Sequence, residues 1–380
     1  MQPLPLGLYI HLPWCERKCP YCDFNSHEAS LVPEQQYIAA LLRDFQEDLP
    51  LLQGRSIETL FIGGGTPSLF SAAAIEQLLR GIAALAPLSP QLEATMEANP
   101  GSAEAGKFRG FREAGITRLS LGIQSFNDDQ LLSLGRVHNS DQAHAAIGFA
   151  RDAGFDSFNI DLMHGLPGQS IASAESDLQT ALNYQPPHLS WYQLTIEPNT
   201  VFHKRPPQLP LEDELADIQE QGEQLLADAD YAQYEVSAYS QRGFQCRHNV
   251  NYWSFGDYLG IGAGAHGKIT LADGRIQRYS KKRQPDEYLT AAPQQFTARR
   301  YVLGANEASG EFMLNALRLN SGFTLQQFET RTGQKAAKLA PQLDSFYQRG
   351  LLVDDGGRVK ATQVGRRFLD NVIAEFFFEA

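Results

Sequence analysis

Short apolar runs alternate with longer amphipathic stretches from Leu6 to about Ile196. The runs have the length of buried strands, and the stretches between them carry apolar residues at helical spacing. The predicted strands are Gly7–Leu12, Ile57–Ile62, Glu93–Ala98, Arg118–Ile123, Ser157–Met163 and His188–Ile196. The predicted helices are Pro33–Leu49, Ser71–Leu85, a helix capped by Ser102, Asp141–Ala153 and Ile171–Leu182. Six such β/α units predict an α/β fold with a parallel sheet, either an open doubly wound sheet or an incomplete barrel.

In both arrangements, ligands bind at the carboxyl ends of the strands. Each of the first five predicted strands is followed there by cysteines, glycines or polar residues: a cysteine loop, Gly63–Pro67, Glu97–Pro100, Gln124-Ser125, and Asp161 with His164–Gly168. Turn chemistry alone explains the glycines and prolines. The polar side chains predict a ligand site at this edge of the sheet.

The loop after the first predicted strand contains Cys15, Cys19 and Cys22, and the only other cysteine lies far downstream. Three thiolates this close suit three irons of a cubic four-iron cluster, which normally has four thiolate ligands, so the fourth iron would stay open. A structural zinc site is the alternative, with His11 or His27 as the fourth ligand. A disulfide would need an oxidising compartment, and no signal peptide is expected at the N-terminus.

The length of 380 residues predicts about two to three domains. No apolar run approaches the roughly 20 residues of a membrane span, so a cytoplasmic protein is expected. The 32 basic and 44 acidic residues give a net charge of -12, which disfavours nucleic acid as a partner.

The pattern changes after Pro198. A helix over Leu211–Ala229 and a strand over Tyr234–Tyr239 are predicted, followed by a hairpin that turns at Asp273-Gly274. From about Glu311 the sequence predicts three helices, a hairpin and a last helix, which together form a winged-helix-like unit. The predicted domains are therefore residues 1–200, an α+β extension over 201–310, and a C-terminal unit over 311–380.

The cysteine spacing and the glycine-rich Gly63–Pro67 turn resemble those of the radical S-adenosylmethionine (SAM) superfamily. Further motifs match its coproporphyrinogen-dehydrogenase-like branch: Tyr9–Cys15, Asp23–Asn25, Glu97–Pro100, Gly122–Phe126, Gly135–His138 and Asp161–Gly168. The resemblance implies a partial (β/α)6 TIM-like barrel of the radical SAM type with an α+β C-terminal extension. It also implies a four-iron four-sulfur (4Fe-4S) cluster on the three cysteines, with SAM chelating the open iron.

The resemblance implies SAM contacts by Tyr9, Gly64, Gly65, Thr66, Glu97, Gln124, Arg136 and Asp161. The chemistry of these residues agrees, because glycines let the backbone approach a ligand and an arginine fork suits a carboxylate. The alternative for Arg136 is a structural ion pair with Asp128 or Asp161. Tyr21, at the aromatic position of the cysteine motif, is expected either to lie against adenine or to pack under the loop.

Two families of this branch compete. The oxygen-independent coproporphyrinogen oxidases have a further cysteine where this chain has Phe24, which disfavours that activity. The heme-chaperone family has a His-Asn-x-x-Tyr-Trp motif, which occurs here as residues 248–253. An imidazole can ligate heme iron, and the two aromatic residues can cover a porphyrin face. The candidate heme-binding residues are His248, Asn249, Tyr252 and Trp253.

Other assignments stay open for this segment. His248 could equally be a core histidine beside packing aromatics, and Cys246 is either an alternative axial thiolate or a small buried side chain. Residues 262–267 formally fit G-x-G-x-x-G, but a hairpin signal follows them and the helix that dinucleotide binding requires is absent from the pattern.

We therefore expect a heme chaperone that carries a 4Fe-4S cluster and SAM and delivers heme to acceptor hemoproteins, with membrane respiratory enzymes as candidates. The alternative function is a SAM-dependent radical oxidoreductase that acts on coproporphyrinogen or a related tetrapyrrole. A flavodoxin-like electron donor, a homodimer and peripheral membrane contact are further expectations.

Overall fold

The computed structural model describes residues 4–101 and 106–377, and its main sheet has twelve strands among those residues. Seven adjacent strands run parallel. In spatial order they are β11 (Asp257–Ile261), β1 (Leu6–Leu12), β4 (Ile57–Gly64), β5 (Leu88–Ala98), β6 (Arg118–Gln124), β7 (Ser157–His164) and β8 (His188–Gln193). The six predicted strands, β1, β4, β5, β6, β7 and β8, follow chain order across the sheet without a reversal, so the sheet is singly wound. It is a partial barrel and not a doubly wound sheet.

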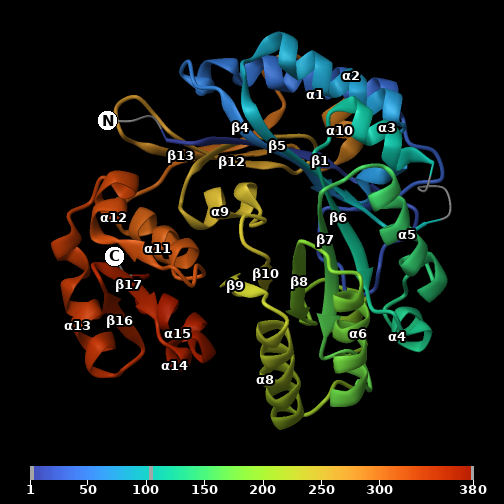
Figure 1. Cartoon of the computed structure of the whole chain (residues 1–380). Helices are drawn as coiled ribbons and strands as arrows, with labels where there is room; N and C mark the ends of the chain where they lie inside the picture. The colour runs from blue at the N-terminus through green and yellow to red at the C-terminus, as the bar shows by residue number, and fades with distance from the viewer. Residues whose placement is uncertain (1–3, 102–105, 378–380) are drawn as a thin grey trace.

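Helices follow the strands and lie along the outer side of the curved sheet (Figure 1). They are α1 (Glu34–Asp48), α2 (Ala72–Leu85), α3 (Lys107–Ala114), α4 (Asp128–Ser133), α5 (Ser140–Asp152) and α6 (Ile171–Asn183). Helix α1 shows why the periodicity predicted them, because its apolar positions Tyr37, Ile38, Leu41 and Phe45 are all fully buried. Helix α4 was not predicted, since six residues give too short a pattern. The predicted cap Ser102 lies outside the described residues.

Antiparallel strands extend both edges of the parallel sheet. Beyond β11 lie β12 (His266–Thr270), β13 (Ile276–Lys281) and β14 (Thr297–Val302), and beyond β8 lie β10 (Ala238–Ser240) and β9 (Ala232–Glu235). The predicted hairpin is confirmed as β12 and β13. The single strand predicted over Tyr234–Tyr239 is wrong, because the chain turns after Glu235, whose carboxylate accepts a 2.9 Å hydrogen bond from the Ser237 N–H.

A second apolar cluster forms the core of the C-terminal part. Around it lie α11 (Ala305–Ala316), α12 (Leu325–Thr332), α13 (Ala340–Gln348), α14 (Gln363–Arg367) and α15 (Leu369–Ala374), with a sheet of β15 (Phe323–Thr324), β17 (Arg358–Ala361) and β16 (Leu352–Asp355). The helices and the small sheet agree with a winged-helix-like unit. Phe255 and Ile276 also belong to this cluster, so the unit packs onto the middle of the chain. The boundaries at residues 200 and 310 stay a prediction.

The remaining helices connect these parts: α7 (Val201–Lys204), α8 (Glu212–Asp228), α9 (Arg247–Trp253) and α10 (Pro285–Leu289). Across residues 4–101 and 106–377, no helix has both the length and the apolar composition needed to cross a membrane.

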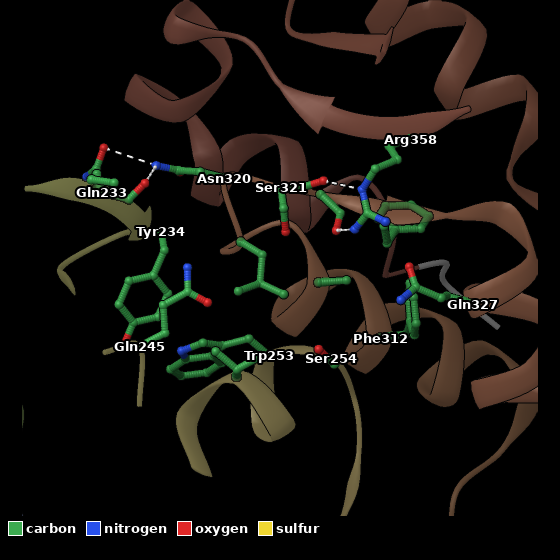
Figure 2. Close-up of a pocket in the computed structure, with 16 residues that line it drawn as sticks. Gln233, Tyr234, Gln245, Trp253, Ser254, Phe312, Asn320, Ser321, Gln327 and Arg358 are labelled. Carbon is green, nitrogen blue, oxygen red and sulfur yellow. Dashed lines mark hydrogen bonds between the residues drawn. The ribbon is translucent and has the colours of Figure 1, made fainter. Parts of the chain in front are cut away.

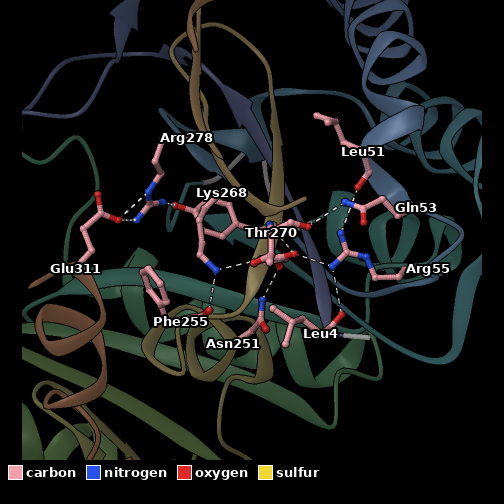
Figure 3. Close-up of polar contacts among 12 residues, drawn as sticks. Leu4, Leu51, Gln53, Arg55, Asn251, Phe255, Lys268, Thr270, Arg278 and Glu311 are labelled. Carbon is pink, nitrogen blue, oxygen red and sulfur yellow. Dashed lines mark hydrogen bonds and ion pairs between the residues drawn. The ribbon is translucent and has the colours of Figure 1, made fainter. Parts of the chain in front are cut away.

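Buried ion pairs of Asp257 with Arg55 and Lys268 stabilise the position of β11 in the sheet. The side chains of Arg55 and Lys268, both labelled in Figure 3, lie 2.7 and 3.1 Å from the carboxylate oxygens of Asp257. The backbone and hydroxyl of Thr270 donate to the same carboxylate at 3.0 and 2.9 Å. Because Asp257 begins β11, these contacts hold in place the strand that brings the middle segment next to β1.

Candidate functional site

The cysteine loop leaves the carboxyl end of β1. Cys15 ends the short strand β2 (Trp14–Cys15), which pairs with β3 (His27–Glu28), and the loop between them carries Cys19 and Cys22. Cys15 is buried and the other two thiols are partly buried. Burial raises the pKa of the Cys15 thiol, with the Thr66 hydroxyl opposing the rise, and burial likewise raises the pKa of Cys22.

The donor set fits a cluster held by three thiolates. As the fourth ligand of a zinc site, His11 would first have to release one of its two partners, because Nε2 donates to the Asn25 carbonyl and Nδ1 accepts from the Tyr9 hydroxyl, both at 2.9 Å. Within the described residues, no three His, Cys, Asp or Glu side chains converge as the ligands of a single metal ion would. Thiolates of a cubic cluster need no such convergence, because each binds its own iron.

The glycine-rich turn after β4 is packed too closely for any side chain. A Cβ atom on Gly65 would lie 2.4 Å from the Trp14 carbonyl oxygen, and one on Gly64 would lie 2.7 Å from the His11 ring. Gly64 also has a φ of +122°, which favours glycine. The turn therefore packs closely against the start of the cysteine loop. A 2.7 Å hydrogen bond from the Thr66 N–H to the Trp14 carbonyl joins the two segments.

Two carboxyl groups face this edge from β5 and β7. Glu97 accepts a 3.1 Å hydrogen bond from the Gly64 N–H, and burial followed by the nearby Asp161 charge raises its pKa to about 7. Asp161 accepts from Ser120 at 2.9 Å and from Asn159 at 2.7 Å. Burial raises the pKa of Asp161 as well, and the hydrogen bonds from Ser120 and Asn159 only partly oppose the rise. Both groups lie where the sequence predicted contacts to a ligand.

Arg136 joins the cysteine loop to the strand ends. It donates from Nη1 to Cys19 Sγ at 3.6 Å and from Nη2 to Asn99 Oδ1 at 2.7 Å and to the Gly122 carbonyl at 2.9 Å. Neither of the expected ion pairs, with Asp128 or with Asp161, forms among the described residues. The guanidinium therefore contacts the cysteine loop and not a structural carboxylate.

Sequence reasoning assigned no role to two further residues of this edge. Asn99, which lies in the Glu97–Pro100 motif, connects Arg136 to Thr66 by a 2.9 Å hydrogen bond from Nδ2 to the threonine hydroxyl. Tyr192 of β8 donates to Gln124 Oε1 at 2.8 Å. This bond holds the predicted site residue Gln124, which has the unusual φ of +68° for a residue with a side chain.

Tyr21 packs under the loop in this structure. Its ring lies 6.4 Å from that of Phe202 and belongs to a small apolar cluster with Leu134 and Met163. Contact with adenine stays a prediction.

A cavity of about 610 Å³ opens beside these groups. Its walls combine predicted SAM residues with residues of the middle segment. The lining residues include Tyr9, His11, Phe24, Gly64, Glu97, Tyr252, His266, Lys281 and Arg283. Three candidate SAM residues, Tyr9, Gly64 and Glu97, and Tyr252 of the candidate heme motif therefore line the same cavity.

Helix α9 carries the His-Asn-x-x-Tyr-Trp motif, and its two aromatic residues line different cavities. Tyr252 lines the cavity described above, whereas Trp253 faces a second cavity of about 380 Å³ against the C-terminal unit (Figure 2). His248 is fully buried, and Nδ1 and Nε2 lie 2.9 Å from the Thr59 hydroxyl and 2.8 Å from the Tyr252 hydroxyl. Burial lowers its pKa to about 3. Asn249 is partly buried.

Cys246 is buried at the start of α9. Its thiol lies 3.8 Å from Glu93 Oε1, and burial raises its pKa to about 11. In this structure it is a small buried side chain and not an open thiolate ligand.

The sheet order, the three-cysteine loop after β1 and the glycine turn after β4 define a radical SAM protein. A model of the radical SAM superfamily matches residues 9–181, which implies a 4Fe-4S cluster and SAM, and a model of the HemN C-terminal domain matches residues 304–368. The chain belongs to the HemW family: it is 49% identical over 380 residues to the heme chaperone HemW of Haemophilus influenzae, covering 99% of this chain and 98% of that protein.

The heme chaperone HemW of Escherichia coli is 48% identical over 376 residues, covering 99% of both chains. Among solved structures, the coproporphyrinogen III oxidase HemN of Escherichia coli superposes with a TM-score of 0.83 at 24% sequence identity, covering 98% of this chain and 90% of that one. The expected fold is confirmed by this likeness.

Proposed function

We propose that this chain binds heme and transfers it to acceptor hemoproteins, as the name of its relatives, heme chaperone, says of them. The observation that carries the proposal is the shared cavity. Tyr252 of the heme motif and the candidate SAM residues Tyr9, Gly64 and Glu97 line the same space of about 610 Å³. Heme bound there would lie next to SAM and the cluster.

In the proposed site, Cys15, Cys19 and Cys22 hold the cluster. Arg136 keeps positive charge beside Cys19, which stabilises a thiolate. The carboxylate of Glu97 and the backbone of Gly64 and Gly65 present acceptors and donors to the amino acid part of SAM. When bound, the cluster and SAM supply one-electron chemistry, and the protein's part is to orient them and exclude water.

The heme assignment of His248, Asn249, Tyr252 and Trp253 is part of the proposal. Tyr252 supports it most directly, because it is the motif residue that lines the cavity. A His248 ring that ligated iron would first have to release Thr59 or Tyr252.

The test is an anaerobic titration of heme into the cluster-reconstituted full chain, followed by transfer to an apo-hemoprotein. Saturable binding and transfer, both reduced in His248→Ala, support the chaperone. Absence of saturable binding, together with cleavage of SAM when coproporphyrinogen is supplied, would establish the oxidoreductase alternative instead.

Respiratory acceptors, a flavodoxin-like donor, a homodimer, a cytoplasmic location and peripheral membrane contact belong to the same proposal. Crosslinking during heme transfer, with purified candidate acceptors, tests the first of these.

A further inference from the structure

A second histidine, His266, is more accessible to a heme iron in this cavity than the fully buried His248. His266 begins β12, is exposed, and lines the cavity shared with the candidate SAM residues. Its ring makes no hydrogen bond with any residue among 4–101 and 106–377, whereas His11, the other histidine of this cavity, uses both ring nitrogens. An exposed neutral imidazole with a free nitrogen is the form that binds heme iron.

A cation suited to a heme propionate lies on the same cavity wall. Arg283 is exposed and donates from Nε to Asn25 Oδ1 at 3.2 Å, and its two terminal nitrogens have no hydrogen-bond partner within the part of the chain that the structure describes. Those nitrogens can bind a carboxylate in a bidentate manner. Lys281, also in this wall, is already paired with Asp44 and Asp48 at 2.5 and 2.6 Å. Of the two cationic side chains in this cavity wall, Arg283 is therefore the one that makes no ion pair with a described residue.

Asn25 of the cysteine loop fixes both groups. Its amide nitrogen donates to the carbonyls of Ala263 and Arg283, each at 2.9 Å. A Cβ on Gly264, two residues before His266, would lie 2.4 Å from that nitrogen, so the glycine permits this close contact. The glycine-rich segment 262–267, which did not fit a dinucleotide site, is explained as the turn that places His266.

The cavity also offers a flat apolar surface. Phe24 stands in its wall with 61% of its surface exposed. Ligand pockets are commonly lined by aromatic side chains together with a few polar groups. A macrocycle over Phe24 would bury this ring.

We propose that His266 is an axial ligand of heme iron and that Arg283 binds a heme propionate, with the macrocycle against Phe24. This inference rests on the proposed function and names the site for its cargo. His248 then acts through Tyr252 as a positioning residue and does not bind iron.

The experiment compares hemin with metal-free protoporphyrin IX, each titrated anaerobically into the cluster-reconstituted full chain. His266→Ala should lose the Soret band of ligated hemin and keep its protoporphyrin affinity, because only hemin offers iron. Free imidazole should restore the band. His266→Met should shift the band and not abolish it. Arg283→Gln should weaken the binding of both compounds, since both carry propionates.

The matched controls are His203→Ala and Arg242→Gln, which alter exposed residues outside this cavity. They should bind hemin as the wild type does. A wild-type spectrum and affinity in His266→Ala would overturn the assignment of the ligand. Equal loss of hemin and protoporphyrin in both His266 variants would overturn it too, because the histidine would then act structurally. Failure of the wild type to bind hemin would instead overturn the proposed function itself.

Discussion

The Nε2 atom of His248 lies 2.8 Å from the hydroxyl of Tyr252, one helical turn away in α9. The other ring nitrogen is 2.9 Å from the Thr59 hydroxyl of β4, and the imidazole stacks on Phe61 at 5.3 Å. The histidine is thereby fixed in the core, and the tyrosine that it contacts lines the cavity. The buried histidine therefore helps to fix the position of Tyr252 in the cavity wall.

His248→Ala should lower the free energy of unfolding by about 2–4 kcal/mol, because it leaves a cavity and removes the partners of two hydroxyls. Tyr252→Phe keeps the ring and should cost only about 1 kcal/mol, the usual value for one hydrogen bond. Urea denaturation of both variants measures the difference. Equal stability of the two would contradict a core role for the histidine.

Glu97 should make the stability of the SAM-free chain depend on pH. Burial, followed by the Asp161 charge, raises its pKa from 4.5 to about 7, so between these values the folded chain holds a proton that the unfolded chain has lost. Stability from this group therefore falls as the pH rises from about 4.5 to 7 and is constant above that range.

The comparison of wild type with Glu97→Gln isolates this effect, because the buried histidines titrate alike in both proteins. The variant should gain stability relative to wild type as the pH rises through this window, by about 1–3 kcal/mol. Urea midpoints at pH 5 and pH 8 provide the measurement. A difference independent of pH would show that folding does not raise the pKa of Glu97.

The sheet and its ligand edge were predictable because both follow from local patterns. Six apolar runs separated by helical periodicity specify β1 and β4 to β8, and the parallel topology then places the carboxyl ends of these strands at one edge. Cys19, Gly64, Glu97 and Arg136 were identified in this way, and the structure brings them together at that edge.

The orientation of α9 and the pairing of β11 with β1 could not be predicted, because both depend on distant contacts. Tyr252 and Trp253 are adjacent in sequence and line different cavities. His266 reaches the shared cavity through the strands that extend from β11. A histidine directly after a glycine-rich turn was the available signal, and no local pattern says which way its ring points.

Gly65→Ala should disturb the cysteine loop and lower stability by about 2 kcal/mol or more, because the new Cβ would lie 2.4 Å from the Trp14 carbonyl, a backbone atom that cannot move alone. Gly148→Ala is the matched control. Gly148 lies in α5, and beyond its chain neighbours and the backbone of its own helix no atom lies within 4 Å of the added methyl, so the exchange should stabilise by about 0.5–1 kcal/mol. Similar losses in both variants would argue against the close packing of the turn. Thermal unfolding and iron content after reconstitution report the outcome.

Asp257→Asn should be the most destabilising of these substitutions. It leaves Arg55 and Lys268 with a neutral partner at the start of β11 (Figure 3), and breaking a buried ion pair costs about 3–5 kcal/mol. Burial opposes ionisation of Asp257, but Lys268 and Arg55 outweigh it and hold the pKa below 3.8. Its contribution is therefore complete above that pH and lost as the pH falls further, so the variant and wild type should converge in acid.

Asp273→Asn serves as the control, because its pair with Arg275 is exposed on both sides and exposed pairs contribute little. Its urea midpoint should match that of the wild type at neutral pH. If Asp257→Asn also matched the wild type, the three buried groups would not be what fastens β11 to the sheet. The position of His266, which depends on that strand, would then need another support.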